Sequence, residues 1–305
     1  MLRYTATKVL WGVVVVFGTA TVAFIVLRIV PGNPITLLLN GTPVAPAVAH
    51  AIKAQFHLGD PLIEQYFLYL GALFHGNLGI SMENGQNVAP QIFSVLPTTL
   101  ELVGAATLIG VVLGTASGLI ASWTHWRWLD RILSATSVLL ASIPAFYGGL
   151  LLLTLFSFTL GWFPAAGDNG FKSLVLPAFT LSLTVIAIIA QMVRDGMREV
   201  MLEPYIFAAR AKGLSESAVR LRHALRNAVG PALTAVGVTL GSLVTGAVVI
   251  EQVFARQGVG QLALNAITHR DFPVVQGVVI VVAFAYVVVN ILVEVLHAYL
   301  DPRIR

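Results

Sequence analysis

Lysine, histidine, serine and cysteine carry most phosphate, metal and hydrolase chemistry, and their spacing in this chain matches none of the common motifs. None of the four lysines follows a glycine, so the GxxxxGK[ST] loop that cradles nucleotide phosphates is absent. None of the seven histidines precedes a glutamate or lies four residues from another histidine, as a helix-borne zinc site requires. The sequence has no GxSxG serine and no cysteine, so we expect no catalytic residue, cofactor or metal in this chain.

The most informative charged stretch runs from Arg194 to Arg226. Within it, Gly213 suits the C′ position that ends a helix, and Ser215 followed by Glu216 supplies a cap and a first-turn acid for the next helix. The pattern predicts a helix, a turn and a second helix that project from the rest of the chain. Either an anionic lipid surface or a protein partner would suit such a basic element with a small-residue face. The residues expected to make the contact are Tyr205, Ala208, Ala209, Arg210, Lys212 and Gly213.

Apolar runs of membrane-spanning length must position this element. The chain of 305 residues is 57% hydrophobic and 10% charged, whereas soluble domains carry roughly 25% charged residues. Runs close to the ~20 residues that cross a bilayer recur along the chain. We predict one all-α membrane domain, residues 1–305, with six transmembrane helices at residues 9–30, 100–122, 132–160, 174–193, 232–250 and 274–295.

Polar segments connect the predicted spans. Residues 31–95 should form an extramembrane cap that includes a short amphipathic helix, Leu62–Phe74. With the amino terminus inside the cell, thirteen lysines and arginines lie in inner segments and four in outer ones. This positive-inside bias predicts that both termini and residues 194–228 are cytoplasmic and that residues 31–95 and 251–273 face outward. The basic pI of about 9.6 therefore indicates membrane topology and no nucleic-acid partner.

Several short motifs resemble those of one transporter family. The segments Ala209–Gly213 and Arg222–Asn227 are similar to the coupling loop, or EAA loop, of ABC importer permeases in the peptide-importer branch. Phe207 stands where the general pattern has glutamate, and Arg226 where it has proline. Similar fragments follow in family order at residues 31–34, 96–102, 130–131, 142–144, 160–164, 270–273 and 301–303. The chain thus resembles the B-type membrane subunit of dipeptide and oligopeptide ABC importers.

This resemblance implies the type I importer fold, a bacterial inner-membrane location and a set of partners. A second homologous permease would help enclose the pathway in membrane lipid, and two ATP-binding subunits would hold ATP and Mg²⁺ and dock on the 194–228 loop. An extracytoplasmic binding protein would deliver peptide. Related permeases serve nickel, glutathione or another small solute. A self-contained secondary transporter is the alternative from another class, but such proteins often show inverted repeats, and none is evident here.

The resemblance also points to contacts outside the cytoplasmic loop. The loop 251–273 should be exposed and should approach the binding protein, because glycines at 258 and 260 permit a tight protruding turn. Its expected contact residues are Arg256, Gln257, Gly258, Gly260, Arg270 and Asp271. Glu101, expected one turn into the second span, and Pro144, which divides the third, are candidates for the pathway or its gate. The alternatives are an acid that caps a helix and a tolerated kink.

Overall fold

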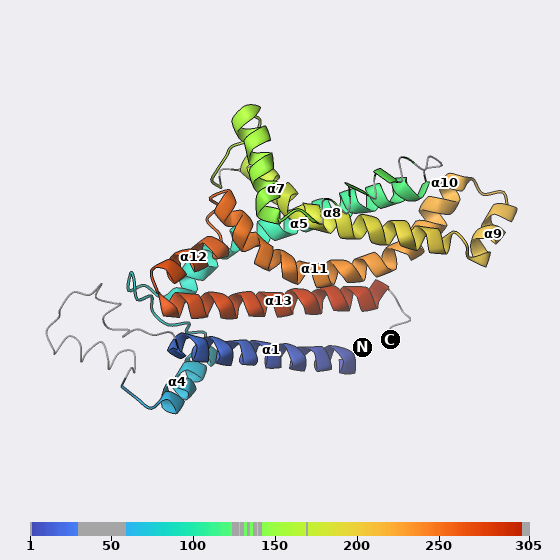
Figure 1. Cartoon of the computed structure of the whole chain (residues 1–305). Coiled ribbons are helices and arrows are strands. Elements are labelled where there is room, and N and C mark those ends of the chain that lie inside the picture. Colours follow the sequence, from blue (N-terminus) through green and yellow to red (C-terminus); the bar gives the residue numbers. More distant parts are fainter. Residues whose placement is uncertain are drawn as a thin grey trace.

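The computed structural model describes residues 2–29, 59–123, 128, 131–132, 135–136, 139, 142–168 and 170–300. The expected motifs at residues 31–34 and 301–303, and part of the apolar run 132–160, lie outside these residues. The described part is helical apart from turns and one isolated bridge between Ile80 and Asn87 (Figure 1). Its elements in chain order are α1 (Leu2–Ile29), α4 (Leu62–Phe74), α5 (Val88–Trp123), α7 (Ala145–Leu152), the π-helix η1 (Leu153–Thr159), α8 (Phe171–Val200), α9 (Pro204–Ala211), α10 (Glu216–Ala218), the π-helix η2 (Val219–Ala224), α11 (Leu225–Val253), α12 (Val259–Thr268) and α13 (Phe272–Leu300).

Four described helices, α1, α5, α8 and α13, are long and apolar enough to cross a membrane. A fifth is present if the helical pieces that meet between Gly237 and Thr239, bent by 48°, count as one span. The apolar helix Ala145–Thr159 is shorter and belongs to the predicted third span. It begins directly after Pro144, which has extended backbone angles and ends the preceding helical turn. The predicted break at Pro144 is therefore confirmed.

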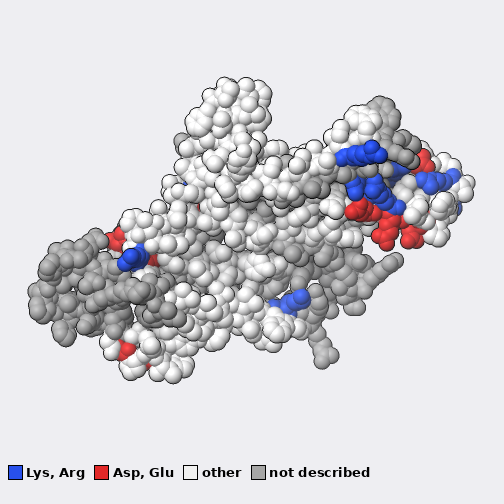
Figure 2. All heavy atoms as spheres, in the orientation of Figure 1, with Lys and Arg blue, Asp and Glu red and all other residues white. Residues whose placement is uncertain are grey.

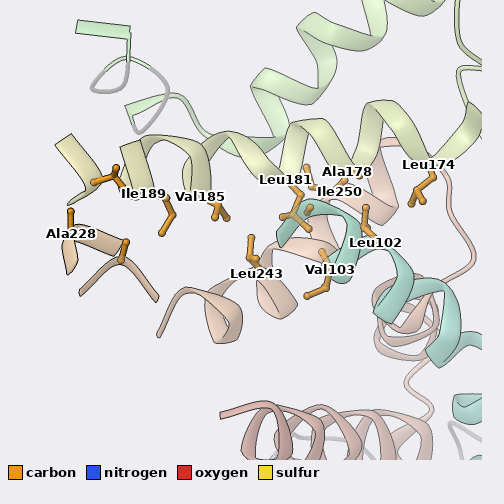
Figure 3. Packing of buried hydrophobic residues seen from close by; sticks show 14 of the residues in the cluster. Leu102, Val103, Leu174, Ala178, Leu181, Val185, Ile189, Ala228, Leu243 and Ile250 are labelled. Atoms are coloured by element: carbon orange, nitrogen blue, oxygen red, sulfur yellow. The ribbon is translucent and has the colours of Figure 1, made fainter. Parts of the chain in front are cut away.

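The centre of the bundle is the close contact between α5 and α8. Glycines at positions 110, 114 and 118 place a smooth stripe on α5, where any added Cβ would overlap Val185, Ile189 or the carbonyl of Ala190 on α8. Small residues at a spacing of four allow this close approach of membrane helices. Side chains of α5, α8 and α11 then fill the interior between the three helices, with Leu102, Val185 and Ile250 among those buried (Figure 3). The three helices form a common core.

The helices α1 and α13 run side by side along one face of this core (Figure 1). The predicted short helix Leu62–Phe74 is α4, which packs across the end of α1 through rings. Phe24 contacts the rings of Tyr66 and Tyr69, with centroids 5.3 Å and 5.5 Å apart. The hydroxyls of Tyr66 and Thr21 lie 2.8 Å apart. This amphipathic helix is therefore fixed to the bundle by aromatic packing.

Two segments differ from the sequence expectation. The helix α5 begins at Val88, so Pro97 lies inside it and Glu101 is far from its first turn. Part of the predicted 31–95 cap is thus the start of a spanning helix. The segment expected as an open loop after α11 contains the helix α12, whose Val259 and Ala266 are buried against α5 and α13. Interior packing, absent from local sequence signals, orders both segments.

Candidate functional site

The helix α9 and the turn after it form the element predicted from the charged stretch. Pro204 occupies the first helical turn, where its missing N–H costs nothing. Gly213 has a φ of +80° and donates its N–H to the carbonyl of Arg210 at 2.9 Å, while Leu214 donates to the carbonyl of Ala209 at 3.4 Å. This pair of bonds is a Schellman ending. The side chain of Ser215 accepts from the amide of Ala218 at 3.4 Å and so starts α10 as expected.

The two faces of α9 have different surroundings. Ile206 and Ala209 are buried in the core of the chain itself, together with Val219 and Ala224 of η2. Ala209 therefore does not line an external contact, which corrects the expectation, since small size here serves internal packing. The exposed side chains on α9 and its flanking turns include Leu202, Tyr205, Phe207, Ala208, Lys212 and Leu214.

Charged side chains link α9 to the next helices. Arg210 donates from Nε to Glu216 Oε1 at 2.6 Å and from Nη2 to Oε2 at 3.3 Å. Arg220 of η2 lies on the other side of the same carboxylate, with Nε 3.6 Å from Oε2. The Arg210 hydrogen bond holds the pKa of Glu216 below its ordinary value and raises the pKa of Arg210. Arg210 is thus paired within the chain while 33% of its side chain stays exposed, and its contact with a partner stays a prediction. Acids and bases lie intermixed at this end of the molecule (Figure 2).

A second group of polar residues lies inside the opposite end of the bundle. Glu251, near the end of α11, is fully buried. Thr99 of α5 donates its hydroxyl to Glu251 Oε1 at 2.5 Å, and the amide of Gly260 in α12 donates to Oε2 at 2.7 Å. The hydroxyl of Thr99 also accepts from the amide of Val259 at 2.9 Å. One carboxylate and one hydroxyl therefore join α5, α11 and the start of α12.

Arg256 extends this group toward α8. Its side chain is 2% exposed, with Nε 3.2 Å from Asp168 Oδ1 and Nη2 3.5 Å from Glu101 Oε2. Nη1 donates to the carbonyl of Ser173 at 3.3 Å, and Asp168 also accepts from the amide of Gln257 at 2.7 Å. A buried charge is tolerated only when it is paired and hydrogen-bonded. We call the buried residues Thr99, Glu251 and Arg256 the buried polar cluster. Glu101 and Asp168, whose carboxylates Arg256 contacts, lie at its exposed edge.

Asp271, 2% exposed, connects another pair of segments nearby. Its carboxylate accepts from the Ser81 hydroxyl at 2.5 Å and from the Met82 amide at 3.0 Å. The same residue precedes α13, whose Val274 amide lies 3.5 Å from Oδ1. Asp271 therefore fixes the turn before α5 to the start of α13.

The positions of Arg256, Asp271 and the two glycines correct the expectation that residues 251–273 form an exposed contact loop. Arg256 and Asp271 are engaged inside the protein. Gly258 and Gly260 are also buried, and a Cβ added at either position would overlap the Glu251 carboxylate. Only Gln257 and Arg270 of the expected set are exposed. Glycine serves close packing here, a use that its sequence pattern does not distinguish from a protruding turn. Glu101 is an exposed carboxylate paired with Arg256 and does not cap a helix.

The sequence missed Thr99, Asp168 and Glu251. Glu251 follows an apolar run of membrane length, and an acid at that place is a usable signal for a buried polar site. Thr99 and Asp168 carry no such signal, since both lie in polar segments. Within the described residues, no three His, Asp or Glu side chains are arranged to hold a metal ion.

Residues 110–305 match the family described as "Binding-protein-dependent transport system inner membrane component", and residues 1–103 match its N-terminal counterpart. The chain belongs to this family. It is a membrane permease subunit of an ABC importer. A relative in Brucella abortus (strain 2308), named "Putative peptide transport system permease protein", is 38% identical over 98% of this chain and 97% of its own length. The glutathione transport system permease protein GsiC of Escherichia coli (strain K12) is 34% identical over 100% of this chain and 99% of its own length.

Solved structures place the permease in the same fold. A chain of the methionine ABC transporter MetNI in an inward-facing conformation aligns with a TM-score of 0.60 over 69% of this permease and 96% of that chain, at 19% identity. A chain of an amino acid ABC transporter crystallised with histidines aligns with a TM-score of 0.52 over 70% and 94% of the two chains. The type I importer permease fold expected from the sequence is confirmed.

Proposed function

We propose that this permease conducts small peptides across the bacterial inner membrane together with a second, homologous permease. Two ATP-binding subunits would hold ATP and Mg²⁺ and drive alternating access, and an extracytoplasmic binding protein would deliver the cargo. Family membership over both halves of the chain supports this assembly. Relatives named for peptide and for glutathione support a peptide cargo, because glutathione is itself a small peptide.

The observation that carries the proposal is the exposed face of α9. Phe207 of α9 and Leu202 of the turn before it are 55% and 77% exposed, while Ile206 on the other face anchors the helix in the core. A rigid element that displays large apolar side chains outside the membrane-spanning helices is suited to bind a protein. The acids Asp195, Glu199 and Glu203 are also exposed here, and they would be repelled by an anionic lipid surface. The mixed charge favours an ATP-binding subunit over lipid as the partner of α9.

At the opposite end, the exposed side of α12 replaces the expected loop as the surface for the binding protein. Leu264 and Ile267 are 39% and 58% exposed, and Arg270 follows them on the surface. The buried side of α12 is fixed by Val259 and Ala266. This arrangement requires α9 to be cytoplasmic and α12 to be outside, in agreement with the positive-inside bias of the sequence.

Matched glycine variants test the docking assignment. Gly213 and Gly76 have similar φ angles of +80° and +73°, and a Cβ added at either position would have no neighbouring atom within 4 Å. Valine therefore strains both turns alike. Gly213→Val should release the ATP-binding subunits from the purified complex or abolish transport, whereas Gly76→Val should do neither. Retention of subunits and transport by Gly213→Val would exclude α9 as the coupling element.

Cargo is tested by competition in proteoliposomes that contain the complete importer. Uptake of a labelled dipeptide should be inhibited by unlabelled dipeptides and should depend on ATP and on the binding protein. Glutathione and Ni²⁺ serve as competitors in separate arms. Inhibition by Ni²⁺ alone, without inhibition by any peptide, would replace the peptide assignment with a metal cargo.

A further inference from the structure

The end of α5 nearest α9 is held by a side chain of η2. Arg220 Nη1 donates to the carbonyl of Ser122 at 3.0 Å, and its guanidinium lies 5.7 Å from the centroid of the Trp123 ring. These are the last two described residues of α5. Arg220, whose side chain is only 14% exposed, therefore binds this end of α5 from a different part of the chain.

The same arginine faces the carboxylate that Arg210 of α9 binds. Glu216 Oε2 is 3.6 Å from Arg220 Nε and 3.3 Å from Arg210 Nη2. Contacts therefore run without interruption from Arg210 in α9, through Glu216 in α10 and Arg220 in η2, to the last turn of α5. A guanidinium presents its donors in a rigid planar fork, so one side chain can hold two partners in a fixed relation.

The glycine stripe determines what a movement of α5 would carry with it. Because a Cβ at Gly114 or Gly118 would overlap atoms of α8, the two helices are in near-backbone contact and cannot slide past each other without repacking. A displacement applied to the end of α5 is thus a displacement of the α5–α8 pair. The helix α8 in turn leads to α9 through the short turn at residues 201–203.

We propose that Arg220 is a positioning residue that couples α9 to the α5–α8 pair through Glu216. The inference rests on the proposed docking of an ATP-binding subunit on α9 and adds the route by which its movement reaches the spanning helices. With Arg220 in place, α9 acts on the bundle at two points, through the chain connection to α8 and through the end of α5. Without it, α9 would still bind its partner, but the end of α5 would no longer follow.

The variant Arg220→Met tests this route, because it keeps most of the side-chain stem and removes the charge. Lys172→Met is its control, since Lys172 is an exposed cation at the start of α8, outside residues 194–228. The measurement is peptide transported per ATP hydrolysed by the complete importer in proteoliposomes. We expect Arg220→Met to retain its ATP-binding subunits and to lower this ratio by about fivefold or more, the range of typical coupling energies. Lys172→Met should match the wild type.

A distance measurement separates positioning from a general loss of folding. Spin labels attached through Ile120→Cys on α5 and Ser217→Cys on α10 are possible because the chain has no cysteine, and both sites are exposed. The label distance should stay narrow in the wild type with and without ATP and should broaden in Arg220→Met. Arg220→Lys keeps the cation without the fork, and it should recover part of the transport ratio. If Arg220→Met fails to insert, Arg220→Lys and Lys172→Arg provide the same comparison.

Two results overturn the proposal. One is a transport ratio for Arg220→Met equal to that of Lys172→Met, and the other is an unchanged label distance in Arg220→Met. Either result leaves the docking assignment standing, provided that Gly213→Val still uncouples the importer. Retained transport in Gly213→Val would instead exclude α9 as the docking element for the ATP-binding subunits. The coupling role proposed for Arg220 would then be excluded as well.

Discussion

The two polar regions of this permease use charge in opposite ways. Around α9, the Arg210–Glu216 pair lies at the surface, and Glu216 is 53% exposed. In the buried polar cluster, Glu251 and Arg256 are almost completely removed from solvent and each contacts several segments. Exposed pairs contribute little to stability, whereas removal of one partner from a buried pair is costly. We therefore expect the cluster to determine the stability of the helix bundle. The α9 region should instead determine how the ATP-binding subunits move that bundle.

The largest effect should come from Arg256→Met. This change leaves Asp168 without its buried cation and removes the link to Glu101 and to the Ser173 carbonyl. Loss of one member of a fully buried ion pair costs about 3–5 kcal/mol of folding free energy, and water that reaches the Glu101 and Asp168 side chains, 59% and 27% exposed, should reduce the cost here. The melting temperature of the purified permease, followed by intrinsic fluorescence in detergent, measures the loss. Arg270→Met is the control, because Arg270 is exposed on the same side, and equal melting temperatures for the two variants would show that Arg256 is not a structural charge.

A smaller loss is expected from Thr99→Val. The substitution preserves shape but removes the hydroxyl that donates to Glu251 and accepts from Val259. Leaving buried polar groups unsatisfied costs about 1–3 kcal/mol. Thr107→Val in the same helix removes only a bond to the carbonyl of Val103 and should change stability little. The melting temperature of Thr99→Val should be clearly lower than that of Thr107→Val. The reverse order would show that the Thr99 hydroxyl does not stabilise the cluster.

The sequence predicted the four long apolar helices α1, α5, α8 and α13 and the turn at Gly213, because both depend on local signals. Apolar length marks a span, and a glycine followed by Ser215 and Glu216 marks a helix end and a new start. The burial of Ala209 and Gly260 depends instead on which distant helix packs against them. An alanine or glycine has the same local pattern whether it approaches a partner protein or the chain's own core. Local patterns therefore place elements well and assign the faces of those elements poorly.

Adjacent alanines on α9 make this distinction measurable. Ala209 is 7% exposed, so Ala209→Trp should overfill the core and cost about 1–3 kcal/mol of stability. Ala208 is exposed, so Ala208→Trp should leave the melting temperature nearly unchanged and weaken retention of the ATP-binding subunits. Thermal unfolding and copurification of the two variants separate the effects. The same phenotype from both alanines would mean that α9 has no distinct inner and outer faces.

The smallest expected effect is a pH dependence of the exposed pair. The pKa of Glu216 is lowered mainly by its hydrogen bond from Arg210, so Glu216 releases its proton more readily in the folded permease than in the unfolded chain. The resulting stabilisation is complete above the ordinary pKa of a glutamate and is lost as the pH falls through the lowered value. Because both side chains are at the surface, salt and water screen the pair and the change in overall stability should be minor. The chemical shift of the Glu216 carboxyl carbon during an acid titration measures the effect directly. Its midpoint should lie below the ordinary pKa of a glutamate, and Arg210→Met should raise it, because that variant lacks the hydrogen bond that lowers the pKa. If the midpoint is the same in Arg210→Met and in the unmodified permease, the Arg210 bond does not persist in solution, and the contact from α9 to Glu216 loses its first step.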